Sequence, residues 1–152
     1  MKRLISIFLA LVLTSSVGPT QANPELVALV NATWLPRVVD AELMSLAADR
    51  AAFQLSYSGG TCGTGSLTHD GATTAEVLAC NMEGPARAVE QWLGSPDHNA
   101  VLSDPGLTAI GCAVAQGRDL FFVCVFNQSL NAPVVAEPEA TTLPNTAVDI
   151  ER

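Results

Sequence analysis

The sequence is short of positive charge. Of its 152 residues, 7 are lysine or arginine and 15 are aspartate or glutamate, and its single lysine is Lys2. A chain this acidic repels phosphate backbones and anionic membrane surfaces. The balance of charge therefore argues against nucleic-acid binding and against membrane binding driven by charge.

Single catalytic and binding motifs are also missing. The chain has no glycine-rich phosphate loop, no His-Glu-x-x-His, no Gly-x-Ser-x-Gly and no EF-hand loop. It has no Cys-x-x-Cys pair either, which argues against a zinc knuckle and against a thioredoxin-type redox site. The function must therefore be sought in residues that are distant along the chain.

Only the first part of the chain has a long apolar run. Met1 to Arg3 is positively charged, Leu4 to Leu13 is mostly apolar, and Thr20-Gln21-Ala22 places small residues where an export peptidase needs them. The pattern predicts a signal peptide over residues 1–22. The run is shorter than the roughly 20 residues of a membrane span, so the cleaved protein is expected to be secreted or periplasmic and not membrane-spanning.

Removal of that segment leaves five arginines against fifteen acidic residues, a net charge near −10. Residues 132–152 are rich in proline, threonine, alanine and glutamate and contain no aromatic residue. Such a segment buries too little surface to fold, so it is expected to be a disordered acidic tail. Residues 23–131 then form one domain with one core.

Four cysteines remain in the expected domain: Cys62, Cys80, Cys112 and Cys124. An even number in an oxidising compartment predicts two disulfides. Three pairings are open. We favour Cys62–Cys80 with Cys112–Cys124, because each closes a short loop and the second brackets an apparent hairpin.

The local patterns predict an α+β fold with helices packed on an antiparallel sheet. Helices are expected from Pro24, from Asp40 as N-cap, from Pro85 and from Ser95 as N-cap. In the second helix the buried face should hold Leu43, Met44, Leu46, Ala47, Ala51 and Phe53. Residues 57–65 should form a loop, residues 77–80 a short strand, and residues 107–127 a hairpin.

The chemistry that remains lies in two histidines and one carboxylate. His69 and Glu76 are seven positions apart around a turn, so they can meet if the segments double back. His98 lies in the first turn of a helix, where the helix dipole should lower its proton affinity. Two imidazoles and a carboxylate are ligands for zinc or another divalent cation. The plainer alternative is that each histidine is a satisfied polar group under a loop.

Five segments in a fixed order give the chain a family likeness. They are ELVALVNATW, DAELMSLAADRAAFQL, LTHDGATTAEVLA, AVEQWLGSPDHNAVL, and GLTAIGCAVA followed by LFFVCVFN. In this order they resemble the CAP superfamily, the SCP-like domain of cysteine-rich secretory proteins, insect-venom antigens and plant pathogenesis-related proteins. The fourth segment is very close to the motif of bacterial members.

This resemblance implies a three-layer α-β-α sandwich with a cavity that holds two histidines and two glutamates. His69, Glu76 and His98 fall on three of those places. The second glutamate is absent, because Ser95 stands at its spacing after Trp92. Ala75 and Val77 also replace the glycine and the asparagine of the family's Gly-Glu-Asn segment. Glu90 is expected on a solvated helix face, and Trp34 and Trp92 in the core.

Three functions remain open. The first is a non-enzymatic binding module for a small hydrophobic ligand, a cell-wall component or an extracytoplasmic protein, and this is the one we expect. The second is a metal-dependent hydrolase, with a metal-bound water as nucleophile and Glu76 as base or ligand. The third is a structural or interaction role, in which the acidic tail docks a partner. No cofactor is expected with certainty.

Overall fold

The computed structural model describes residues 20–69 and 75–127. Its elements in chain order are β1 (Thr20–Ala22), α1 (Pro24–Thr33), β2 (Val38–Val39), α2 (Ala41–Ser58), β3 (Glu76–Asn81), α3 (Pro85–Leu93), α4 (Pro96–Leu102), β4 (Ala109–Gln116) and β5 (Leu120–Phe126). Most of the predicted signal peptide and the predicted acidic tail lie outside the described residues.

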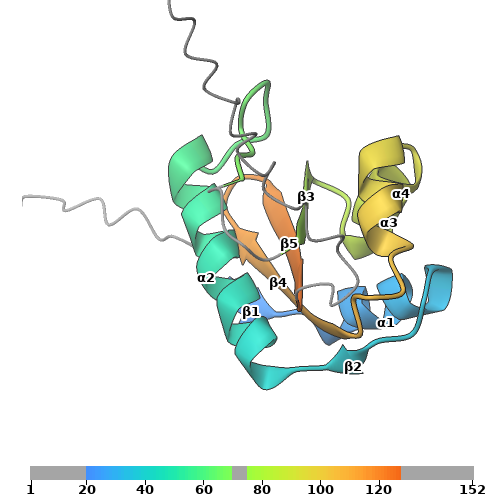
Figure 1. Cartoon of the computed structure of the whole chain (residues 1–152). Helices are drawn as coiled ribbons and strands as arrows, with labels where there is room; N and C mark the ends of the chain where they lie inside the picture. Colours follow the sequence, from blue (N-terminus) through green and yellow to red (C-terminus); the bar gives the residue numbers. More distant parts are fainter. Residues whose placement is uncertain (1–19, 70–74, 128–152) are drawn as a thin grey trace, which may run out of the picture.

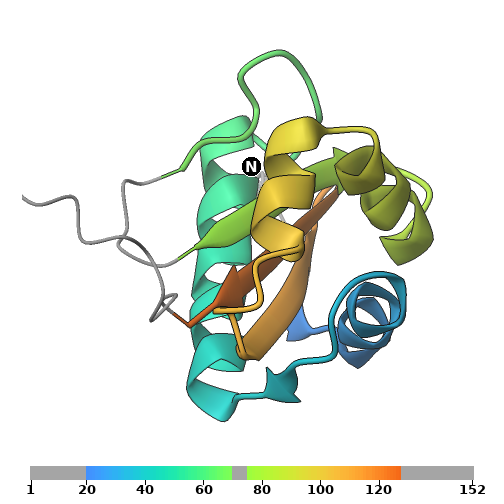
Figure 2. The same cartoon turned by 45° about the vertical axis from the view of Figure 1, so that its right-hand side comes forward.

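The elements form three layers. Helix α2 covers one face of the sheet, while α1, α3 and α4 cover the other (Figures 1 and 2). Each face has its own apolar core, one beneath α2 and one beneath the three remaining helices. The predicted α-β-α sandwich is therefore confirmed.

The sheet has the strand order β1-β4-β5-β3, and the short strand β2 also pairs with β4. Antiparallel ladders join β4 to β5 and β5 to β3, as the predicted hairpin requires. The pairing of β2 with β4 is parallel. In this one pair the sheet differs from the antiparallel sheet that was predicted. Side chains along β5 alternate between the two cores, which explains why the strand is a continuous apolar run.

The helices begin where the sequence predicts. Asn23 accepts a hydrogen bond from the backbone N–H of Leu26, and Asp40 accepts one from Leu43, both at 2.9 Å. Helix α2 runs to Ser58, one half-turn into the segment that was predicted to be a loop. It ends at Gly59, whose positive φ of 67° is a conformation that glycine adopts without strain.

Three side chains on α2 differ from the predicted pattern. Phe53, predicted to be buried, is 42% exposed and stacks on Tyr57 at the surface. Arg50 and Gln54 are buried on the face that packs on the sheet. The prediction for Phe53 was wrong because polar partners on neighbouring elements hold these two residues inside.

The central hairpin is packed tightly against α2. A Cβ atom at Gly111 would collide with the backbone of Leu43 and Met44, so only glycine allows this approach of helix to strand. On the other face of the sheet, Cys112 and Cys124 lie opposite each other in the β4–β5 register and form a disulfide. Both sulfur-bearing residues are fully buried.

Arg37 joins the start of β2 to the segment between α4 and β4. It is 6% exposed, and its guanidinium donates to the backbone carbonyls of Leu107 at 2.8 Å and Leu102 at 2.7 Å. The side chain of Asn31 bonds both the N–H and the carbonyl of Arg37. Burial lowers the pKa of Arg37, and Asp104 acts in the opposite direction.

Strand β1 consists of the last three residues of the predicted signal peptide. Thr20 to Ala22 pair with Ala113 to Ala115 of β4, and the N–H of Asn23 donates to the carbonyl of Cys112. The described structure therefore uses these three residues as part of the sheet.

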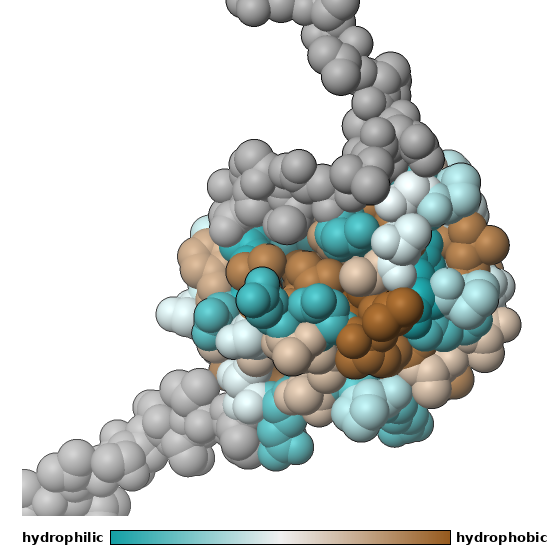
Figure 3. All heavy atoms as spheres, turned by 60° about the horizontal axis from the view of Figure 1, so that its bottom comes forward, coloured by the Kyte–Doolittle hydropathy of each residue, from teal (hydrophilic) through white to brown (hydrophobic). Residues whose placement is uncertain are grey.

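The surface near β2 carries exposed apolar side chains. Leu35, Val38 and Val39 are 39%, 73% and 57% exposed, and apolar residues are visible among polar ones on this end of the molecule (Figure 3). Within residues 20–69 and 75–127, no helix is both long and apolar enough to cross a bilayer.

Candidate functional site

The best-defined polar cluster joins α2, β3 and the loop between them. Arg50 donates from Nε to Oε2 of Glu76 at 3.1 Å and from Nη2 to Oε1 at 2.8 Å. Nδ1 of His69 lies 2.7 Å from the same Oε1. The segments double back as the sequence analysis required, and they bring His69 and Glu76 into contact.

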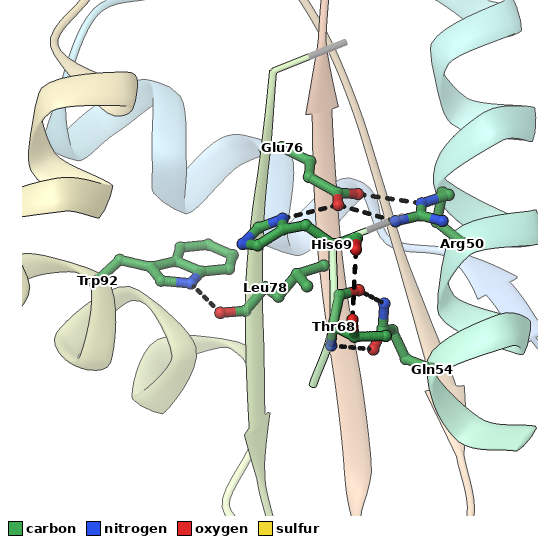
Figure 4. Close-up of polar contacts among 7 residues, drawn as sticks. All are labelled: Arg50, Gln54, Thr68, His69, Glu76, Leu78 and Trp92. Carbon is green, nitrogen blue, oxygen red and sulfur yellow. Dashed lines mark hydrogen bonds and ion pairs between the residues drawn. The ribbon is translucent and has the colours of Figure 1, made fainter. Parts of the chain in front are cut away.

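A glutamine holds His69 in reach of that carboxylate. Nε2 of Gln54 donates to the carbonyl of Thr68 at 2.6 Å, and its Oε1 accepts from the N–H of Thr68 at 3.1 Å. The side chain of Gln54 thus forms the same pair of hydrogen bonds with the backbone of Thr68 that a neighbouring strand would form (Figure 4). His69 follows directly, and its side chain remains 60% exposed.

The carboxylate itself is deeply placed. The side chains of Glu76 and Arg50 are 6% and 8% exposed. A buried ion pair is stable when its geometry satisfies both partners, and a bidentate guanidinium satisfies both carboxylate oxygens. Glu76 is therefore the acceptor at the centre of the cluster and presents little free surface to a substrate.

His98, the third predicted residue, lies in the first turn of α4. Ser95 occupies the N-cap position, as predicted, but its side chain makes no capping hydrogen bond. The pKa of His98 is lowered, first by burial and then by the nearby His69, while Asp97 opposes the shift. The predicted direction is correct, but the leading cause is burial and not the helix dipole.

The three predicted residues do not form a ready metal site. Among the described residues, the donor atoms of His69, Glu76 and His98 do not all lie within 4.8 Å of one another. The guanidinium of Arg50 also occupies the carboxylate that a cation would need. A zinc centre needs three converging donors with free lone pairs, and the arrangement does not fit one.

A pocket of about 290 Å³ lies beside this cluster, and His98 forms part of its wall. The walls come from Cys62, Gly63, Ser66 and Leu67 of the loop, Leu78 to Cys80 of β3, Gln91 and Trp92 of α3, and His98 of α4. His69 and Glu76 are not part of the lining. The cluster of Arg50, Glu76 and His69 and the pocket are thus neighbouring but separate features that share β3.

The second disulfide closes this pocket on the loop side. Cys62 pairs with Cys80, the partner favoured by the sequence analysis, and both are partly exposed. Oδ2 of Asp119 accepts a hydrogen bond from the N–H of Cys62 at 2.6 Å. The donor atoms of Cys62, Cys80 and Asp119 lie within 4.8 Å of one another, but the disulfide consumes both sulfur atoms.

Trp92 and Glu90 lie where the sequence predicts, whereas Trp34, predicted to be in the core, is half-buried and packs against it. Trp92 is fully buried, and its indole N–H donates to the carbonyl of Leu78 at 2.8 Å. The indole of Trp34 donates to Asn99 at 2.8 Å. Glu90 is 64% exposed and pairs with Arg87 on the surface of α3.

Arg50 and Gln54 are the site residues that the sequence analysis missed. A signal for them was present. Positions 47, 50, 51 and 54 share one helical face, and Ala47 and Ala51 were assigned to the core. An arginine between two buried alanines requires a buried acceptor, and Glu76 is that acceptor.

Comparison with known proteins identifies the family of the chain and proteins of similar structure. The model of the CAP family, described as the cysteine-rich secretory protein family, matches residues 33–126, more than half of the chain. No curated protein matches the chain. An outer surface protein of Borrelia burgdorferi is similar in structure with a TM-score of 0.50 and 23% identity, over 68% of this chain and 87% of that one.

Proposed function

The chain belongs to the cysteine-rich secretory protein (CAP) family, and from this premise we propose that it is an extracytoplasmic binding domain without catalytic activity. Two disulfides suit the oxidising conditions outside the cytosol. Export by the predicted signal peptide would place it in the periplasm or outside the cell. The ligand classes in question are a small hydrophobic molecule, a cell-wall component and an extracytoplasmic protein.

The observation that carries this proposal is the bidentate pair of Arg50 and Glu76. A general base needs a lone pair that reaches the substrate proton or the attacking water. In this cluster Oε1 already accepts from Arg50 and contacts His69, while Oε2 accepts from Arg50. The carboxylate therefore acts as a fixed acceptor, which suits a structural role beside the pocket better than proton transfer.

The same pair argues against the metal-dependent hydrolase. A divalent cation at Glu76 would lie beside a guanidinium, and like charges at such distances repel strongly in a buried site. Removal of the guanidinium should therefore expose a latent metal preference. Arg50→Met is expected to raise the zinc affinity of the chain by at least about tenfold. This factor corresponds to the loss of about 1.4 kcal/mol of repulsion between the cation and the guanidinium.

Zinc titration by calorimetry tests this directly, with the wild type, Arg50→Met and Arg87→Met as a matched surface control. We expect no one-to-one zinc uptake in the wild type or the control. One zinc per wild-type chain that is lost in His98→Ala would contradict the proposal and restore the metal site. Turnover of a broad peptide and ester panel, abolished by a chelator, would do so as well.

A second candidate is a protein-interaction role, and the exposed residues Leu35, Val38 and Val39 favour it. Exposed apolar side chains that gather in one region often mark contact surfaces. Sedimentation analysis across a range of protein concentrations tests self-association through this surface. Replacement of Val38 and Val39 by threonine should abolish any association that depends on it.

A further inference from the structure

We propose that the pocket walled by the Cys62–Cys80 loop, β3, α3 and α4 is a binding site for a small uncharged molecule with one apolar face and one hydroxyl or amide group. This inference rests on the binding role proposed above and names the ligand class. It also moves the ligand away from the cluster of Glu76 and His69, which does not line the pocket.

The absence of charge in the lining indicates an uncharged ligand. Among the residues that the structure describes, those of the pocket wall include no aspartate, glutamate, lysine or arginine. An ionised group that enters such a site loses its hydration without gaining a counter-charge, and that costs far more than burial of a neutral group. His98 adds no counter-charge at neutral pH, because burial lowers its pKa and keeps the imidazole neutral.

The apolar side of the ligand is indicated by the side chains around it. Leu67, Leu78, Ala79 and the indole of Trp92 contribute to the wall together with the disulfide. Pockets for drug-sized ligands are usually about 300–1,000 Å³, and this one has about 290 Å³. The occupant is therefore at or below the small end of that range.

The polar group of the ligand is indicated by His98. His98 is part of the pocket wall. Its Nδ1 lacks a hydrogen-bond partner within the described residues but is covered by protein, so the ligand's polar group would meet the part of the imidazole that lines the pocket. A neutral imidazole has one donor and one acceptor, and a hydroxyl or an amide group can complement either. By contrast, the amide of Gln91 already donates to Cys80 and accepts from Asn81.

Three probes of similar size test each part of this inference: benzyl alcohol, toluene and benzoate. Binding to the full ¹⁵N-labelled exported protein is followed by the amide signals of Gly63 and Ser66 and by the indole N–H signal of Trp92. Benzyl alcohol should shift these signals saturably. Benzoate should bind at least about tenfold more weakly, and toluene about fivefold more weakly because it leaves His98 without a partner.

Substitution of His98 then separates the polar from the apolar contribution. His98→Phe should bring the affinities for benzyl alcohol and toluene within about twofold of each other. Leu93→Phe adds the same side chain at an exposed position of α3 and should leave all three affinities unchanged. If His98→Phe fails to fold, Ser66→Leu, which fills the pocket from the loop, should weaken all three probes together.

Equal binding of benzoate and benzyl alcohol would overturn the inference, and so would shifts confined to the exposed pair Phe53 and Tyr57. The absence of saturable shifts with all three probes would overturn it as well. None of these results bears on zinc uptake by Arg50→Met or on turnover, so failure of this inference is distinguishable from failure of the proposed function.

Discussion

Arg37 and Arg50 are equally buried, at 6% exposure each, and each guanidinium lies over an aromatic ring. Their polar partners differ. Arg37 donates to backbone carbonyls of the segments before β2 and between α4 and β4. Among the described residues, Arg50 donates to the carboxylate of Glu76.

The difference in partners indicates different roles: Arg37 stabilises the fold, and Arg50 belongs to the candidate site. Carbonyl groups fix the position of Arg37, burial lowers its pKa, and the charge of Asp104 offsets only part of that shift. Glu76 neutralises Arg50, and the neutral pair can then sit beside a ligand pocket without attracting ions. Two buried arginines in one small domain thus serve different ends, and substitutions can tell them apart.

The largest effect is expected from Arg37→Met. The substitution leaves the carbonyls of Leu102 and Leu107 buried without donors, at roughly 1–3 kcal/mol each, and also removes the contact with the ring of Phe126. The free energy of unfolding should fall by about 4–6 kcal/mol in urea titrations. Arg37→Lys should lose less, because it keeps one donor group. A loss below about 1 kcal/mol for methionine would show that the carbonyls find other partners.

A slightly smaller effect is expected at the carboxylate pair. Glu76→Leu alone should cost about 3–5 kcal/mol, because it leaves the charge of Arg50 buried without its carboxylate. The double variant with Arg50→Met should recover most of that loss, since apolar replacement of a buried ion pair is often close to neutral. Urea unfolding of the four proteins of this double-mutant cycle gives the coupling energy. Simple additivity would mean that Arg50, like Arg37, is held mainly by other contacts.

The third prediction concerns His98, a partly buried group that, unlike the two arginines, is uncharged at neutral pH. Its pKa in the folded protein lies below the ordinary histidine value of 6.5 because the imidazole is buried, so the unfolded chain takes up the proton first as the pH falls. Stability contributed by the neutral imidazole is thus present above about pH 6.5 and is lost as the pH falls below it. Unfolding of the wild type and His98→Phe at about pH 7.5 and pH 5 should show a steeper loss in the wild type. Parallel losses would show that other groups cause the acid sensitivity.

The smallest effect is expected from a substitution at Val38, which follows Arg37 in the chain but lies on the surface. Val38 is 73% exposed although it follows a buried arginine. Val38→Thr keeps the β-branched shape and should change the free energy of unfolding by less than about 0.5 kcal/mol. Thermal unfolding measures this. A larger change would mean that the side chain is covered in solution, as in a self-associated form.

The features that could be predicted from the sequence are those that neighbouring residues determine. Asp40 and Asn23 cap their helices because the capping side chain and the N–H groups lie three residues apart. His69 and Glu76 were expected to meet because a short loop joins them. The pairing of Cys112 with Cys124 follows from the hairpin that brings β4 and β5 together.

The features that were missed depend on distant partners. Strands β1 and β2 have three and two residues, too few for a pattern, and they exist because β4 offers them an edge about 70 to 95 residues later. Arg50 and Glu76 are 26 positions apart, and nothing local indicates their contact. The helical spacing of apolar residues assigned Phe53 to the core. That spacing does not show that the hydrogen bond to Thr68 holds Gln54 on the buried face instead.

Strand β1 links the assembly of the sheet to the predicted removal of residues 1–22. The predicted peptidase site ends at Ala22, and the same three residues are hydrogen-bonded along β4 once the domain has folded. A chain cut before folding begins at Asn23 and leaves the backbone of Ala113 to Ala115 as an open edge, which is a template for another strand. A chain folded before the cut keeps that edge covered. If residues 1–22 are removed as predicted, the order of cleavage and folding would decide whether the mature domain has this sheet edge open or covered.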